Sequence, residues 1–148
     1  KTRTRGKVND YRDWGIQLGR RFRALKLWFV IRSFGLEGLR EKIRYHISLA
    51  EKLEQKINNS TDFEMVTPRT LNLLCFRYKA KHLSDLDQIN SINEQLLQKV
   101  NKTGKIFITH TKMNGIYTLR MVIAQTNVNE NHVNNAWELI QETAIQLK

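Results

Sequence analysis

An Asn-Gly pair between two strand-like runs is the feature that most constrains the fold of this chain. Residues 106–111 and 116–123 have the composition of strands, and Lys112-Met113-Asn114-Gly115 lies between them. Asn-Gly tolerates the positive φ angles that a tight two-residue hairpin requires, so we expect the two strands to pair antiparallel. Helical periodicities on both sides of this hairpin then predict an α+β fold.

Two helical patterns open the chain. Residues 22–34 are apolar on nearly every side, so a helix there is expected to be buried on most sides, with Trp28 and Phe29 dominating its packing. Gly35 is expected to end this helix. Apolar residues at steps of three and four from Leu36 to Ile57 predict a long amphipathic helix after it.

Two strand candidates follow at residues 63–67 and 71–79, with a turn at Pro68 between them. The second run does not alternate cleanly, because Leu73 and Leu74 are adjacent. A strand that is apolar on both sides is typical of one that is covered on both faces. We therefore expect both faces of this strand to be buried.

Two further amphipathic helices complete the pattern. Ser84 is expected to cap the helix whose apolar face runs over residues 89–100. Asn127 and Glu130 resemble a capping box before the last helix, over residues 133–147. The order helix, helix, strand, strand, helix, strand, strand, helix predicts an antiparallel sheet of three to four strands packed on helices.

The length of 148 residues suits one domain, and we expect a mobile arm over residues 1–9 and a single domain over residues 10–148. No apolar run approaches the roughly 20 residues of a membrane helix, and no signal peptide is visible. One cysteine excludes an internal disulfide framework and fits a reducing cytosol. The expectation is a soluble, cytoplasmic protein whose first residue, Lys1 rather than Met, marks a cut or engineered start.

The charge is strongly basic and uneven. The chain has 25 Lys and Arg against 14 Asp and Glu, a formal net charge of +11, and residues 1–26 hold nine of the cations and only two carboxylates. Such a block often marks a surface for nucleic acid or anionic membrane. A solvated tail, or a surface that meets acidic segments outside this chain, fits the same pattern.

The residues with metal-binding or nucleophilic chemistry are isolated along the chain. The four histidines, His46, His82, His110 and His132, do not occur at metal-ligand spacing, and Cys75 has no second cysteine nearby. Each histidine is expected to be structural or on the surface, and Cys75 to be a small buried thiol. By itself, the chain is expected to have no catalytic residues, no cofactor site and no metal site.

One cluster does suggest a binding role. Leu18-Gly19-Arg20-Arg21-Phe22-Arg23 places three guanidinium groups in four positions, just before the first predicted helix. Arginine binds carboxylate or phosphate bidentately, and a helix N-terminus reinforces anion binding. Gly19 would let a ligand approach the backbone closely. We expect Arg21 and Arg23 to pair with carboxylates of the fold, and Arg20 to be the functional residue.

These segments resemble the C-terminal part of the group II pyridoxal-phosphate amino-acid decarboxylases, and among them the aromatic-L-amino-acid decarboxylase branch. The resemblance runs from about residue 10 to the end. It is carried by Asp10-Tyr11-Arg12-Asp13-Trp14, Leu18 to Val30, Arg32-Ser33-Phe34-Gly35, Leu74-Cys75-Phe76-Arg77, Tyr117-Thr118-Leu119-Arg120 and His132-Val133-Asn134-Asn135-Ala136-Trp137.

The resemblance implies a fold and a site. Such enzymes are fold-type I homodimers that hold pyridoxal phosphate and substrate at the subunit interface, and their C-terminal small domain is an antiparallel sheet covered by helices. Gly19 would then shape the substrate pocket. Arg20 matches the arginine that faces the substrate carboxylate in glutamate-acting relatives. Both are expected to bind the aromatic amino-acid substrate of the whole enzyme.

The chain departs from the family pattern in one respect. The family binds its cofactor through a lysine that follows a histidine, and sets an aspartate against the pyridine nitrogen. This sequence has no His-Lys pair, and Lys81-His82 is the reverse order. The cofactor is the electron sink of the reaction, so without that lysine the chain alone is expected to be inactive.

The parent function expected from the resemblance is therefore removal of the carboxyl group of an aromatic L-amino acid. Two alternatives stay open: a freestanding basic module for nucleic acid, and aldehyde synthesis by the parent enzyme, which an upstream loop residue decides.

The fragment is also expected to self-associate through Trp28 and Phe29, which would meet the large domain in the whole enzyme. Neither nucleic acid nor membrane is the expected partner.

Overall fold

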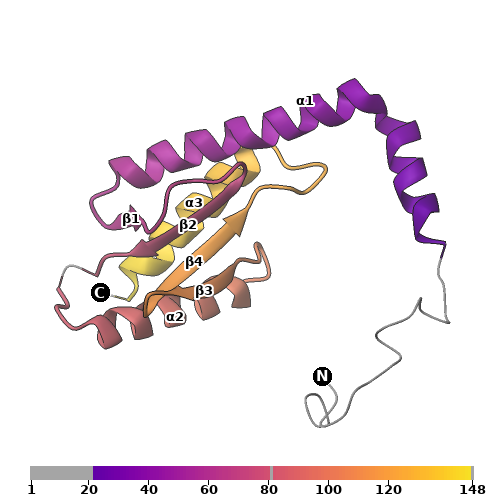
Figure 1. The fold of residues 1–148 in the computed structure, drawn as a ribbon. Coiled ribbons are helices and arrows are strands. Elements are labelled where there is room, and N and C mark those ends of the chain that lie inside the picture. The colour runs from indigo at the N-terminus through magenta and orange to yellow at the C-terminus, as the bar shows by residue number, and fades with distance from the viewer. Residues whose placement is uncertain (1–21, 81, 148) are drawn as a thin grey trace, which may run out of the picture. The chain divides into compact units, whose positions relative to one another are not determined.

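The computed structural model describes residues 22–80 and 82–147, and Figure 1 shows their arrangement. Within these residues there are three helices and four strands, which confirms the α+β class. In chain order they are α1 (Arg23–Asn59), β1 (Phe63–Met65), β2 (Leu73–Tyr78), α2 (Leu86–Lys102), β3 (Thr109–Met113), β4 (Ile116–Val122) and α3 (Glu130–Ile145). The chain divides into two compact units, residues 1–39 and residues 40–148.

The four strands form one antiparallel sheet in the order β1-β2-β4-β3. The predicted hairpin joins β3 to β4. Asn114 and Gly115 have φ angles of 50° and 81°, as a tight turn with two left-handed residues requires. The prediction of an antiparallel sheet with three to four strands is therefore confirmed.

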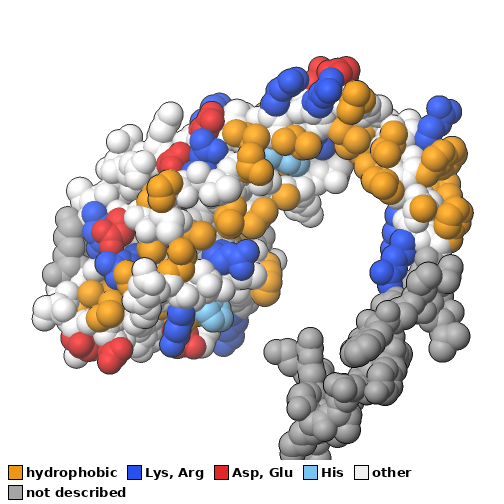
Figure 2. Space-filling model, in the orientation of Figure 1, with side chains coloured by type: hydrophobic (Ala, Val, Ile, Leu, Met, Phe, Trp, Pro, Cys, Tyr) orange, Lys and Arg blue, Asp and Glu red, His pale blue; other side chains and the backbone are white. Residues whose placement is uncertain are grey.

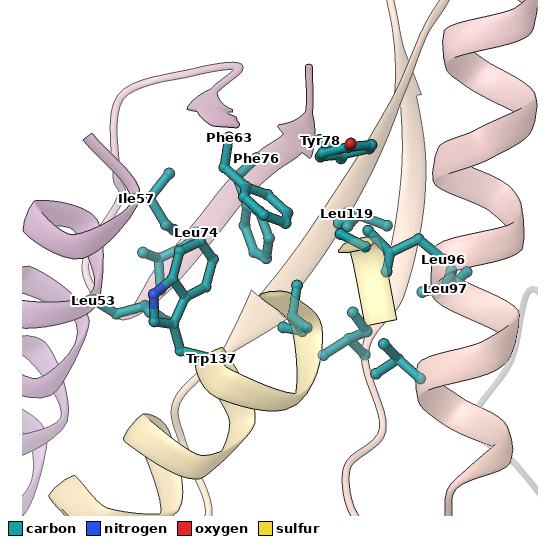
Figure 3. Close-up of a cluster of buried hydrophobic side chains, with 14 of the residues drawn as sticks. Leu53, Ile57, Phe63, Leu74, Phe76, Tyr78, Leu96, Leu97, Leu119 and Trp137 are labelled. Atoms are coloured by element: carbon teal, nitrogen blue, oxygen red, sulfur yellow. The ribbon is translucent and has the colours of Figure 1, made fainter. Parts of the chain in front are cut away.

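The core of the second unit lies between the sheet and the helices (Figure 3). Trp137 of α3 meets Phe63 edge-on at 4.9 Å between ring centroids, and Phe76 at 6.2 Å. Leu53 and Ile57 of α1 are 1% and 0% exposed in the same cluster. This apolar cluster is what holds the helices on the sheet, because aromatic side chains bury the largest areas.

Only one face of the sheet is covered by the helices of the second unit. Leu74, Phe76 and Tyr78 of β2 belong to the core, whereas on the opposite side Cys75 is buried and Leu73 and Arg77 are half-buried. Figure 1 shows α2 and α3 together behind the sheet. The expectation that both faces of β2 are buried is therefore confirmed at Cys75, and Leu73 and Arg77 beside it are half-buried.

A buried asparagine fixes α2 to β2. Asn93 is fully buried, and its amide accepts a hydrogen bond from the Tyr78 backbone N–H at 2.8 Å and donates one to the Tyr78 carbonyl at 2.9 Å. The last residue pair of β2 with β4 is Phe76 with Leu119, so Tyr78 lies beyond it. Asn93 thus supplies the hydrogen bonds of a neighbouring strand, as buried backbone groups require.

Two more asparagines of α2 bind backbone in the same way. Asn90 donates to the Gly115 carbonyl at 2.8 Å and accepts from the Tyr117 N–H at 2.7 Å. Asn101 donates to the carbonyl of Ile108 and accepts from its N–H, both at 2.9 Å. The helix is therefore attached to the sheet by polar contacts as well as by its apolar face.

The ends of the helices differ in detail from the sequence predictions. Asp85, not Ser84, caps α2, by accepting a hydrogen bond from the Gln88 N–H. Asn129 rather than Asn127 caps α3, and the reciprocal partner is His132 rather than Glu130. Neighbouring residues with short polar side chains compete for the cap position, and the backbone conformation decides between them.

Gly35 interrupts α1 as predicted. Its φ of 65° and ψ of 176° are not helical, so α1 consists of two helical stretches on either side of it. A residue with a side chain is strained at that φ, whereas glycine is not. The glycine therefore marks the end of the apolar stretch and the start of the amphipathic one.

Candidate functional site

The two predicted substrate residues, Gly19 and Arg20, lie outside the residues that the structure describes, as does Arg21. Their roles stay predictions from the sequence. The described chain begins at Phe22, directly after this cluster, and enters α1 at Arg23. The structure therefore shows the helix that follows the cluster.

The stretch of α1 before Gly35 is exposed in this chain. Trp28 and Phe29 are 53% and 57% exposed, and their rings meet edge-on at 5.1 Å. The Arg32 guanidinium lies 5.9 Å from the centre of the Trp28 ring. Among the described residues, the expectation that this stretch is buried on most sides is wrong, and Figure 2 shows its hydrophobic side chains at the surface. A helix that is apolar all round needs covering surfaces on several sides, and the described residues leave it exposed.

Cys75, His110 and His132 lie where the sequence predicted, as a buried thiol and as structural or surface histidines. Cys75 is a buried thiol without a disulfide partner, and His132 serves as a helix-capping residue. His110 is exposed and stacks on the Tyr117 ring, with ring centroids 4.6 Å apart. In the described part of the chain, no group of three metal-ligating side chains comes together.

One histidine is buried without its full set of hydrogen bonds. His46 is 6% exposed, and its Nε2 atom has no hydrogen-bond partner within the described residues. It lies on α1, in the stretch that joins the core. The sequence placed His46 in a helix but contained no signal for this unpaired nitrogen.

Tyr117 is the described group whose pKa departs clearly from its ordinary value. Burial raises the pKa of its phenol, and the nearby Glu94 carboxylate raises it further. Both effects disfavour the phenolate, because a negative charge loses solvation on burial and is repelled by a second one. Tyr117 is therefore a neutral hydroxyl group at pH 7.

The face of the sheet opposite the core carries residues that the sequence did not mark as a site. Leu73 pairs with Val122 and Cys75 pairs with Arg120, so these four residues share that face with Arg77. The apolar pattern on both sides of β2 was the sequence signal for this face. On this face Cys75 is 8% exposed and Arg77 donates to the Glu64 carboxylate at 2.6 Å, so side chains of the sheet itself cover part of it.

Comparison with known proteins identifies the family. The pyridoxal-dependent decarboxylase conserved domain matches residues 2–79, which is more than half of the chain. The chain belongs to the pyridoxal-dependent decarboxylase family, as the resemblance indicated.

Individual relatives agree with this assignment. The chain is 46% identical over 141 residues to tyrosine decarboxylase 4 of Petroselinum crispum. The aligned region covers 93% of this chain and 28% of that protein. The chain is also 46% identical over 140 residues to the phenylacetaldehyde synthase of Arabidopsis thaliana, covering 95% of the chain and 28% of that protein. The chain therefore spans little more than a quarter of the length of these relatives.

A solved structure shows the same fold. Tryptophan decarboxylase of Catharanthus roseus, in complex with L-tryptophan, superimposes with a TM-score of 0.80 at 38% identity, over 96% of this chain and 29% of that one. The alternative of a nucleic-acid module has no support in these comparisons. No helix among the described residues has the length and apolar character needed to cross a membrane.

The described residues do not fit a pyridoxal phosphate site. Such a site requires a lysine for the cofactor aldehyde and a sequestered carboxylate for its ring nitrogen. The buried polar side chains that the structure shows are His46, Asn93, Thr118 and Thr143, with no lysine and no carboxylate. The cofactor of the family therefore requires residues beyond those described here, and we derive no chemical step through it.

Proposed function

We propose that this chain is the C-terminal domain of a pyridoxal-phosphate-dependent enzyme that removes the carboxyl group of an aromatic L-amino acid. The observation that carries the proposal is the 46% identity to a tyrosine decarboxylase across 93% of the chain. The structural match to tryptophan decarboxylase supports an aromatic substrate but does not select among aromatic amino acids. The parent enzyme works as a cytoplasmic homodimer, as the family resemblance implies.

Within that enzyme, Gly19 and Arg20 bind the substrate. Gly19 has no side chain and leaves room in the pocket next to the backbone. Arg20 carries a permanent positive charge and a planar pair of donors, which suit a carboxylate. The cluster directly precedes α1, where the helix N-terminus adds partial positive charge.

A hybrid enzyme tests the proposal. In it, this chain replaces the matching C-terminal part of the Petroselinum crispum tyrosine decarboxylase 4, so that the upstream body of the relative is present. We expect the hybrid to decarboxylate tyrosine, and the 148-residue chain alone to be inactive and to retain no pyridoxal phosphate after dialysis. A folded hybrid with bound cofactor but no activity toward tyrosine, tryptophan, dopa or histidine would overturn the proposed function.

The roles of Gly19 and Arg20 are tested in the same hybrid. Arg20→Gln keeps a polar side chain but removes the charge, so it should raise KM for the amino acid. Arg12→Gln removes a cation of the same segment that we place outside the pocket, and serves as the matched control. Equal effects of the two changes would contradict a substrate role for Arg20.

A second candidate activity is aldehyde synthesis. It is favoured by the 46% identity to a phenylacetaldehyde synthase, which equals the identity to the decarboxylase. Since the deciding loop residue lies upstream, the product should follow the body to which this chain is attached. A hybrid with the upstream part of the Arabidopsis thaliana synthase should therefore release the aldehyde, and the hybrid with the decarboxylase body should release the amine.

The chain by itself is expected to self-associate through the exposed stretch of α1. Trp28 and Phe29 are apolar and more than half exposed, and contiguous apolar surface of this kind drives association. Sedimentation should show a mass that rises with concentration, and Trp28→Ser with Phe29→Ser should lower it. A clean monomer over a wide concentration range would contradict this.

A further inference from the structure

The turn of the β3–β4 hairpin holds a pair of residues that is open to spontaneous chemical change. Asn114-Gly115 is the one Asn-Gly pair in the sequence, and both residues are exposed. The side-chain amide of Asn114 has no hydrogen-bond partner among the described residues. Asparagine is a thermolabile residue, and a glycine after it leaves the next backbone nitrogen unhindered, because glycine has no side chain.

Deamidation at such a pair needs water as its only other reactant. The backbone nitrogen of Gly115 bonds to the side-chain carbonyl carbon of Asn114. The bond from that carbon to the amide nitrogen breaks, and ammonia leaves with the proton of the Gly115 nitrogen. Water then opens the five-membered imide at either carbonyl. One product is aspartate, and the other is isoaspartate, in which the main chain runs through the side chain and is longer by one carbon atom.

The folded turn opposes this reaction. Ring closure requires the Gly115 nitrogen and the Asn114 side chain to lie on the same side of the Asn114 Cα–C bond. Asn114 has a φ of 50°, in the left-handed region, where a ψ of roughly +30 to +60° turns that nitrogen away from the side chain. Deamidation can therefore proceed only after the turn opens.

Asn90 of α2 holds the turn closed. Its Nδ2 atom donates to the Gly115 carbonyl at 2.8 Å, and its Oδ1 atom accepts from the Tyr117 N–H at 2.7 Å. The pairing of β3 with β4 ends at Met113 with Ile116, so the turn residues lie beyond the strand pairs. Opening the turn at Gly115 therefore requires the loss of the hydrogen bond from Asn90.

We propose that Asn114 is a site of spontaneous deamidation and that the hydrogen bonds of Asn90 control its rate. This inference is independent of the proposed function, because it uses only contacts of the hairpin with α2. A two-residue turn has a fixed geometry, and isoaspartate adds one carbon atom to it. The Gly115 carbonyl and the Tyr117 N–H then no longer match the two ends of the Asn90 amide, so deamidation weakens the attachment of the hairpin to α2.

The test follows the 148-residue chain by mass spectrometry during incubation at mildly alkaline pH. Trypsin releases residues 113–120 as one peptide, and Asn114 is its only asparagine, so conversion at this residue is measured separately from all others. The same chain unfolded in guanidinium chloride gives the rate without protection. We expect the folded chain to react more slowly by about tenfold or more, because the turn has to open first.

Matched variants test the role of Asn90. Asn90 and Asn101 are both half-buried residues of α2 with two hydrogen bonds to backbone, but Asn101 binds Ile108, at the opposite end of β3 from the turn. Asn90→Ala should speed the conversion of Asn114 in the folded chain by about fivefold or more, whereas Asn101→Ala should change it by less than about twofold. Asn90→Asp removes the donor to Gly115 and keeps the acceptor for Tyr117, so it gives the same test if Asn90→Ala does not fold.

The outcomes separate the parts of the proposal. Absence of conversion at Asn114 in the unfolded chain would overturn the site, and equal rates in the folded and unfolded chain would overturn the protection by the turn. Equal acceleration by Asn90→Ala and Asn101→Ala would show that general destabilisation, rather than Asn90, controls the rate.

The effect of the product is measured against Asn114→Asp, which has the new charge without the added carbon atom. The isoaspartate form of the chain, separated after incubation, should melt at a lower temperature than this variant. Equal melting temperatures would contradict the proposed weakening of the hairpin.

Discussion

The two stretches of α1 on either side of Gly35 are both rich in apolar residues, yet only one of them is packed. Before the glycine, Leu27 and Trp28 are 62% and 53% exposed, whereas Leu53 and Ile57 after it are 1% and 0% exposed. The later stretch meets the sheet and α3 within the same unit. Apolar composition indicates that a helix face is to be buried. It does not indicate which residues bury it.

The largest expected effect comes from matched truncations in the two stretches. Leu53→Ala should lower the free energy of unfolding by about 2–5 kcal/mol, because it leaves a cavity in a packed core. Leu27→Ala should change it by less than about 0.5 kcal/mol, because the side chain is exposed. Chemical denaturation of both variants measures the difference. Similar losses in the two would mean that the first stretch is packed in solution.

A second prediction concerns the polar part of the packed region. Asn93→Ala should cost about 1–3 kcal/mol, since it removes both hydrogen bonds to the Tyr78 backbone from a buried site. Asn90→Ala removes a similar pair of bonds at a half-buried site, where water can replace them, and should cost less. Thermal unfolding of the two variants ranks them. A larger loss for Asn90→Ala would contradict the role assigned to burial.

A third prediction concerns the boundary between the two stretches. Gly35→Ala should destabilise the chain by about 1 kcal/mol, because alanine is strained at a φ of 65°. Gly38→Ala should stabilise it by about 0.5–1 kcal/mol, since Gly38 is helical and an added Cβ would lie in ordinary contact with the Phe34 side chain. Opposite signs in circular-dichroism melts would support the interruption, and stabilisation by both changes would exclude it.

The smallest effect is a pH dependence within the packed unit. The folded state raises the pKa of Tyr117 above its ordinary 10.0, so the folded protein holds this proton more tightly than the unfolded chain. The contribution to stability is complete below pH 10 and is lost as the pH rises through the folded-state value. Tyr117→Phe should therefore flatten the decline of stability above pH 10, as measured by urea unfolding. An unchanged slope would show that Tyr117 titrates normally.

Much of the fold could be predicted from local patterns. The Asn114-Gly115 turn, the break at Gly35 and the apolar periods of the helices depend on neighbouring residues, and all were found in the structure. The helix caps were displaced by one or two residues, to Asp85 and Asn129. Adjacent polar residues offer nearly equivalent caps, so a small difference in backbone geometry selects among them.

The candidate site could be predicted only in part. The residues around Gly19 and Arg20 carried the family resemblance, and the family match bears that resemblance out. The left-handed φ of Leu71 could not be predicted from the sequence, because φ angles depend on contacts between distant residues. The pairing of Arg69 with Glu51 and Glu54 has the same origin.

The sequence by itself determined the class of fold, the family and the positions where the chain turns, since these depend on residue type and short-range spacing. The tertiary structure decided which apolar side chains of the described residues are buried and which are exposed. The reason is that burial is a property of pairs of surfaces: Leu53 and Trp28 are both apolar helix residues, and only Leu53 has the sheet and α3 packed around it.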